Sequence, residues 1–120
     1  MSVKLETNFG VISIETEVIA KVAGTAALEC YGIVGMAAKS VRDDLIHLLK
    51  KESLTKGIKV DVLKNNALDI TLHIIVEYGT SIPAIGDVVA STVKYKIEDS
   101  LGLIVNQVYI CVDGVLNHNI

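Results

Sequence analysis

The stretch from Leu68 to Leu101, LDITLHIIVEYGTSIPAIGDVVASTVKYKIEDSL, decides the fold because it predicts one long strand, a glycine break and one long helix. Apolar residues alternate with mostly polar ones in the first part, a period of two that directs one row to a core: Ile70, Leu72, Ile74, Val76 and Tyr78. After Gly79, apolar residues recur every three or four positions from Ile85 to Leu101, which predicts one buried helical stripe. Ser81 is expected to cap this helix and Gly102 to end it.

The segments before this stretch predict a hairpin, two helices and a further strand. Strand-like runs on either side of Asn8-Phe9-Gly10 suggest an opening hairpin, and Thr16 is expected to cap a helix that continues to Cys30. A second helix is expected from about Ser40, where Ser40 and Asp43 have capping-box spacing. A strand at 58–62 then leads through a turn at Asn65-Asn66 into the opening stretch.

The last predicted element is a strand from Leu103 to Val112 that carries apolar residues on both faces. A strand of this kind is either central in a sheet or covered by a partner. If a partner binds, we expect it beside this strand.

Together these elements predict an α+β fold, a two-layer sandwich in which helices cover one face of a mixed sheet. The expected order is β-β-α-α-β-β-α-β. The length of 120 residues and the absence of a long linker predict a single domain over residues 1–120.

Composition narrows the classes of function. A net charge of -3 argues against a general binder of nucleic acid or anionic membranes, since phosphate neutralisation needs clustered Lys and Arg. Apolar runs are too short to span a bilayer, and the N-terminus lacks the layout of a signal peptide, so we expect a cytoplasmic protein without direct membrane insertion. Cys30 and Cys111 lack any metal-type spacing and are expected to be reduced thiols. The aliphatic surplus, with 51% hydrophobic residues, favours self-association or a protein partner.

No catalytic motif is recognisable, and we expect no catalytic residues, metal or cofactor. The sequence lacks a nucleophile elbow, a paired-histidine metal motif and a phosphate-binding loop. An enzyme would require any two of four residues, coming from separate elements, to converge in a pocket: His47, His73, Asp43 and Asp44. His47 beside the two aspartates is more simply a solvated helix face.

A nucleic-acid alternative rests on Gly32-Ile33-Val34-Gly35 between the two predicted helices, which matches the element order of a KH domain. The middle residues Ile33 and Val34 are apolar where a basic or polar residue would help to clamp a backbone. We therefore expect RNA binding to be the weaker alternative.

Five segments in order resemble the alkaline shock protein family of Gram-positive envelope stress response proteins, and within it the short YloU-like members. They are Gly10-Val11-Ile12-Ser13-Ile14, Val18-Ile19-Ala20-Lys21-Val22-Ala23, Tyr31-Gly32-Ile33-Val34-Gly35-Met36, Val76-Glu77-Tyr78-Gly79-Thr80-Ser81-Ile82, and Leu101-Gly102-Leu103 with Val108-Tyr109-Ile110-Cys111-Val112-Asp113-Gly114-Val115. The resemblance covers nearly the whole chain. It implies a small cytoplasmic protein without catalytic activity, linked to envelope homeostasis.

The resemblance also implies partners: a dihydroxyacetone-kinase-like or fatty-acid-kinase-like protein, or a membrane-anchored protein that holds the chain at the membrane periphery. The expected function is a non-catalytic interaction and assembly module of an envelope or alkaline stress response, with a homo-oligomer expected. The candidate interaction or loop residues are Gly32, Ile33, Val34, Gly35, Tyr78, Gly79 and Tyr109.

Overall fold

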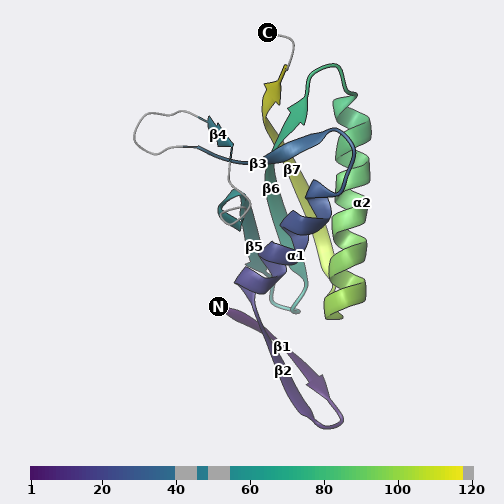
Figure 1. The fold of residues 1–120 in the computed structure, drawn as a ribbon. Coiled ribbons are helices and arrows are strands. Elements are labelled where there is room, and N and C mark those ends of the chain that lie inside the picture. Colours follow the sequence, from purple (N-terminus) through teal and green to yellow (C-terminus); the bar gives the residue numbers. More distant parts are fainter. Residues whose placement is uncertain (40–45, 49–54, 118–120) are drawn as a thin grey trace.

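Strand β6 (Leu68–Glu77) is the centre of the structure, a computed structural model that describes residues 1–39, 46–48 and 55–117. Figure 1 shows its neighbours: strands β1 (Ser2–Thr7), β2 (Gly10–Glu15), β3 (Ile33–Lys39), β4 (Ile46–Leu48), β5 (Ile58–Val62) and β7 (Val105–Leu116), with helices α1 (Thr16–Leu28) and α2 (Ile82–Leu101). One edge of β6 pairs antiparallel with β5 along its first half and with β3 along its second half. The other edge pairs with β7 in parallel along its whole length.

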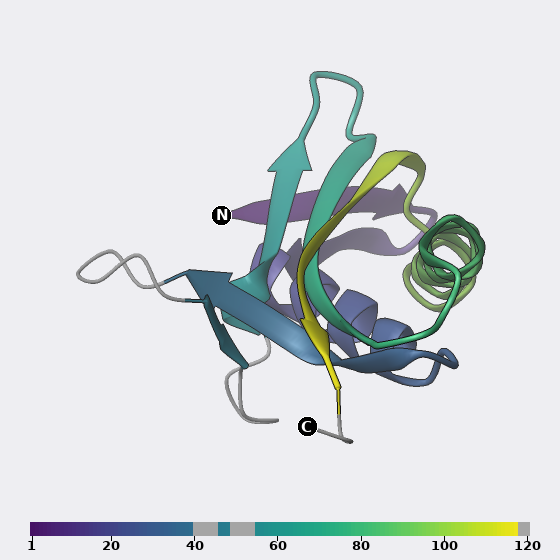
Figure 2. The ribbon, with the colours of Figure 1, turned by 90° about the horizontal axis from the view of Figure 1, so that it is seen from above.

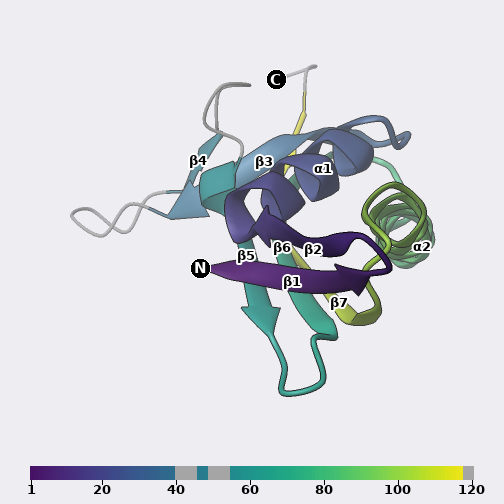
Figure 3. The same ribbon diagram turned by 90° about the horizontal axis from the view of Figure 1, so that it is seen from below.

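The two faces of β6 have different environments. Every second residue is buried and joins the main core: Leu68, Ile70, Leu72, Ile74 and Val76. Helices α1 and α2 pack against this face and against each other (Figures 2 and 3), while the residues between are partly or largely exposed. The predicted α+β class, with helices on one face of a mixed sheet, is confirmed.

Helix α2 forms where the local signals predict it. The hydroxyl of Ser81 accepts a hydrogen bond of 3.4 Å from the amide of Ala84, and Pro83 lies in the first turn, where its missing amide hydrogen costs nothing. Gly102 ends the helix with a φ of 69°, a left-handed conformation that favours glycine. The β6-to-β7 connection through this helix is the crossover that a parallel pair requires.

The predicted second helix is wrong where the structure describes the chain. Residues 33–39 form β3 and residues 46–48 form β4, two strands that pair with each other. The segment before Ser40 was expected to be a connector between two helices, but Met36 and Ala37 are buried in β3, so pairing with β6 and burial make it a strand. The Ser40–Asp43 capping box lies outside the described residues. Thr16 also departs from expectation, because it is the first helical residue and the preceding Glu15 is the N-cap.

The opening hairpin β1–β2 forms a separate two-stranded sheet that projects from the body (Figure 1). Its base is fixed: Val3 is buried, the amide of Thr16 donates to the Met1 carbonyl oxygen at 3.0 Å, and Asn66 Nδ2 donates to the Lys4 carbonyl oxygen at 3.3 Å. Phe9, at the turn, is fully exposed. The hairpin is therefore anchored at its base and open at its tip.

Candidate interaction surface

Strand β7 lies at the edge of the sheet, with β6 as its single strand partner among the described residues. It is 12 residues long, and its register against β6 shifts near each end, which leaves a regular segment from Gln107 to Val112. Within that segment the run Val108-Tyr109-Ile110-Cys111-Val112 contains no charged residue and no proline. Natural edge strands usually carry lysines, prolines or other features that prevent pairing with a further chain. This segment lacks those side chains.

A shallow hollow of about 310 Å³ runs beside the first part of this edge. Its helix wall contains Ala90, Asp87 and Lys94 of α2, and its strand wall contains Val105 to Val108. The small Ala90 side chain keeps the space open, while the two charged residues provide one carboxylate and one ammonium group. A strand added to β7 would place its inward side chains next to this hollow.

On the open face of the sheet, His73 and Asp113 join β6 to β7. His73 Nδ1 lies 2.9 Å from Asp113 Oδ2, so the imidazole donates to the carboxylate across the strand pair. Cys111 is the register partner of His73, and Tyr109 is the partner of Thr71. Tyr109 is about half exposed at 51%, so its ring contributes apolar surface to the accessible side of the sheet.

The structure brings the candidate residues Gly32 and Tyr78–Gly79 together at one end of the sheet, away from Tyr109. The amide of Glu77 donates to the Gly32 carbonyl oxygen at 2.9 Å, and the amide of Tyr78 donates to the Leu116 carbonyl oxygen at 2.9 Å. Gly32 and Gly79 have φ values of 88° and 90°, which only glycine adopts readily. Apolar side chains are exposed around this end: Tyr31, Tyr78, Ile82, Val115 and Leu116.

The KH-like interpretation of Gly32 to Gly35 is wrong. Ile33 pairs with Val76 and Gly35 pairs with Ile75, so these residues enter strand β3. Val34 lies at the register irregularity between those pairs. A KH loop connects two helices, and the segment that follows Gly32 is a strand instead.

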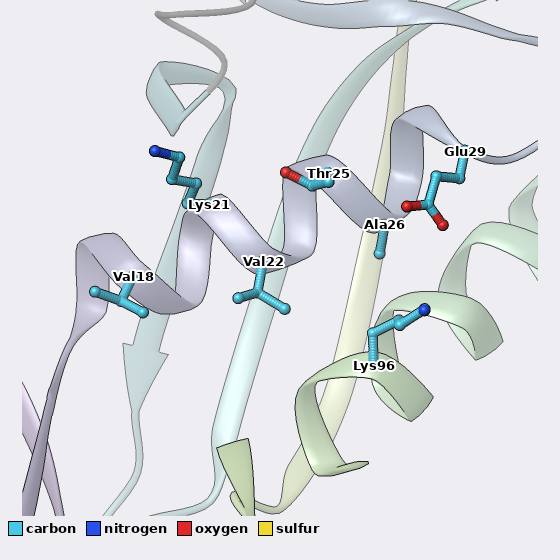
Figure 4. A pocket seen from close by; sticks show the side chains of 7 residues that line it. All are labelled: Val18, Lys21, Val22, Thr25, Ala26, Glu29 and Lys96. Carbon is cyan, nitrogen blue, oxygen red and sulfur yellow. The ribbon is translucent and has the colours of Figure 1, made fainter. Parts of the chain in front are cut away.

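A second hollow, of about 320 Å³, lies between the two helices (Figure 4). The apolar side chains that line it are Val18, Val22 and Ala26 of α1. Charged side chains also line it: Lys21 on α1, Glu29 at the C-cap of α1, and Lys96 on α2. Figure 4 shows Lys96 and Glu29 extending toward one another from the two helices.

The residues of the enzyme alternative do not supply a visible catalytic set. His73 bonds to Asp113, and His47 belongs to β4. Asp43 and Asp44 lie outside the described residues. Within the described ranges, three or more His, Cys, Asp or Glu side chains nowhere gather in a metal-binding group. Similarly, none of the helices described is long and apolar enough to cross a membrane.

Sequence reasoning missed Asp113 and the exposed apolar end of the sheet. Asp113 is 40 positions from His73, and the contact depends on a parallel register with an irregularity near it. The predicted final strand stops at Val112, whereas β7 continues through Val115 to Leu116. Val115 and Leu116, which follow Asp113 and Gly114, are the apolar signal that could have indicated the longer strand.

Comparisons with known proteins agree with the resemblance in the sequence. Residues 4–117 match the model of the alkaline shock protein family, which is described as having a cell envelope-related function. The chain is 45% identical over 116 residues to YloU of Bacillus subtilis (strain 168), covering 96% of each chain. It is 36% identical over 118 residues to Spy1614 of Streptococcus pyogenes serotype M6, covering 96% of this chain and 95% of that protein.

A more distant relative is YqhY of Bacillus subtilis, 28% identical over 110 residues, with 92% of this chain and 80% of that protein covered. No solved structure matches significantly. The family match and the YloU similarity both extend across nearly all of the chain, and both agree with the motifs from Gly10 to Val115. The chain therefore belongs to the alkaline shock protein family, whose members have a cell envelope-related function.

Proposed function

We propose that this protein is a non-catalytic docking and assembly module that acts in an envelope or alkaline stress response. One observation carries the proposal: β7 lies at the edge of the described sheet, and its run from Val108 to Val112 contains no charged residue. An extended segment that adds to a sheet edge gains main-chain hydrogen bonds for affinity, and pockets for alternate side chains give specificity. The hollow beside Ala90 and the half-exposed Tyr109 supply such side-chain sites on the two faces.

The partner we propose is a protein that presents an extended strand. The family resemblance favours a kinase-like or membrane-anchored protein, and a membrane-anchored partner would hold this chain at the cytoplasmic periphery of the membrane. The family's cell envelope-related function supports such a placement.

The test compares two tyrosine variants. Tyr109→Lys places a charge on β7 without opening the core, because Tyr109 is 51% exposed. Tyr95→Lys is the matched control, since Tyr95 is exposed on α2 and lies outside the hollow beside β7. Proteins captured from the host by the wild type and by Tyr95→Lys, but lost with Tyr109→Lys, are then purified and tested for direct binding.

Amide hydrogen exchange on the purified complex locates the contact. We expect protection to rise along Gln107 to Val112 when the partner binds, because strand addition engages the free backbone groups there. Exchange in the β1–β2 hairpin is the internal reference. The proposal would be contradicted by a partner that binds both variants equally and leaves the amide hydrogen exchange of β7 unchanged.

A further inference from the structure

We propose that the tip of the β1–β2 hairpin of one copy inserts into the hollow between α1 and α2 of a second copy. The proposed contact goes beyond docking at β7 and uses none of that strand. It joins two different surfaces of the same chain, the projecting Phe9 and the hollow lined by Val18, Val22 and Ala26.

The hairpin tip is built to project an apolar side chain. The Phe9 amide donates to Thr7 Oγ1 at 3.2 Å, and that hydroxyl donates to the Gly10 carbonyl oxygen at 3.3 Å, so the turn is held by its own bonds. Phe9 is fully exposed, and Val11 and Ile12 beside it are at least half exposed. A fixed turn that presents its apolar residues to solvent loses little conformational freedom when they are buried by a partner.

The hollow between the helices suits that side chain in size and chemistry. Apolar cavities of about 150 Å³ accept a benzene ring, and this hollow measures about 320 Å³, which leaves room for a phenyl ring and a neighbouring aliphatic group. Val18 is 47% exposed at its edge, so it would lose further apolar surface when the tip binds. Figure 4 shows Val18 and Val22 on the same side of α1.

Charge also favours a second copy as the occupant. The charged side chains that line the hollow are Lys21, Lys96 and Glu29, a net charge of +1. The outer half of the hairpin, from Leu5 to Ile12, carries Glu6 as its one charged residue, a net charge of -1. The two surfaces are therefore complementary, and an acidic hairpin argues against an anionic membrane as the target of Phe9.

The hairpin cannot reach the hollow of its own chain. Strand β2 runs from the tip at Gly10 to Glu15, directly before α1, so six strand residues of about 3.3 Å each separate Phe9 from the start of the helix. Figure 1 shows the tip pointing away from α1. A contact between copies is the arrangement that remains for these two surfaces.

Because the tip and the hollow are different surfaces, each contact leaves one free tip and one free hollow. Such an interface produces open chains or closed rings, in contrast to the single dimer that a two-fold interface gives. This property allows a complementation test with two variants. Phe9→Asp removes the tip but keeps the hollow, while Val18→Asp alters the hollow but keeps the tip.

Analytical ultracentrifugation then measures association over a range of concentrations. We expect concentration-dependent assemblies for the wild type and a loss of affinity of about thirtyfold or more for each variant alone, as for a buried aromatic hot spot. In an equimolar mixture, the intact tip of Val18→Asp can bind the intact hollow of Phe9→Asp. The mixture should therefore form a complex of two chains and no larger species, because the tip and the hollow left free in that complex are the altered ones.

Controls separate this contact from misfolding and from the β7 edge. Circular dichroism checks that both variants keep the wild-type fold. Val88→Asp, at a valine of similar exposure that does not line the hollow, should associate like the wild type, as should Tyr109→Lys. A wild type that stays monomeric, a mixture of folded variants that stays monomeric, or association abolished by Tyr109→Lys would overturn the proposal.

Discussion

Replacing Gly32 by alanine should destabilise the fold through two separable effects, backbone strain and a close contact. Gly32 has a φ of 88°, and a left-handed conformation costs a residue with a Cβ about 1–2 kcal/mol. An added Cβ would also lie 2.6 Å from Ile85 Cδ1, and overpacking of this kind costs about 1–3 kcal/mol. Gly32→Ala should therefore lower the free energy of unfolding by about 2–5 kcal/mol.

Two other glycines separate these effects. Gly79 has a φ of 90° but open space at its Cβ position, so Gly79→Ala should cost only the backbone strain, about 1–2 kcal/mol. Gly86 lies in helix α2, again with open space, and Gly86→Ala should stabilise the protein by about 0.5–1 kcal/mol.

Urea unfolding followed by circular dichroism measures all three variants, with the double variant Gly32→Ala/Ile85→Val as the decisive sample. Ile85→Val removes the Cδ1 atom that the new Cβ would meet, so the double variant should be more stable than the sum of the single effects predicts. Equal losses for Gly32→Ala and Gly79→Ala, together with additive effects in the double variant, would refute the close approach of Gly32 to Ile85.

Three further outcomes follow from the core, the helix cap and the open face of the sheet. Leu72→Ala, at a fully buried position of the central strand, should lower the free energy of unfolding by about 2–5 kcal/mol in urea. Ser81→Ala should cost about 1 kcal/mol because it removes the cap of α2, whereas Ser91→Ala, at an exposed position in the middle of the same helix, should be neutral or slightly stabilising in thermal unfolding. Asp113→Asn should cost no more than about 1 kcal/mol, because its bond to His73 is partly exposed; a loss above about 3 kcal/mol would show a larger role.

The strand and helix from Leu68 to Leu101 could be predicted because their signals are local. Alternation, a serine cap and a left-handed glycine each act within a few residues, and the structure places all three as expected. The turn at Asn65-Asn66 was predictable for the same reason, and Asn66 has the positive φ of 65° that asparagine tolerates.

The strands at 33–39 and 46–48 could not be predicted from local signals. The capping-box spacing of Ser40 and Asp43 favours a helix from about Ser40, and Gly32 to Gly35 favour a connector before it. Strand β3 forms because it gains hydrogen bonds from β6, a strand more than thirty residues later in the chain, and β4 forms by pairing with β3. Whether β6 is available to pair with β3 depends on the whole fold. Local helix propensity is small compared with the effect of such pairing, so it predicts poorly here.

The candidate surface was predictable in part. Apolar residues on both faces of the final strand indicated a central position or a partner, and the structure places β7 at the edge of the sheet instead of at its centre. Gly32 and Tyr78 could be selected as loop residues, but their meeting at one end of the sheet depends on the antiparallel register of β3 and β6. Tyr109 lies away from these loops, because the register of β7 against β6 pairs it with Thr71.

The parallel pairing of β6 with β7 has a consequence for synthesis on the ribosome. Strand β6 ends at Glu77 and β7 begins at Val105, so one edge of the central strand has no partner while the connecting residues are being made. At about 5–20 residues per second, that interval lasts about 1–6 seconds. During this time the nascent chain exposes the edge of its most apolar strand, and early docking of α2 onto the sheet would shorten the exposure. Slower translation across residues 78–104 should therefore increase aggregation of the newly made chain, even though the finished protein is unchanged.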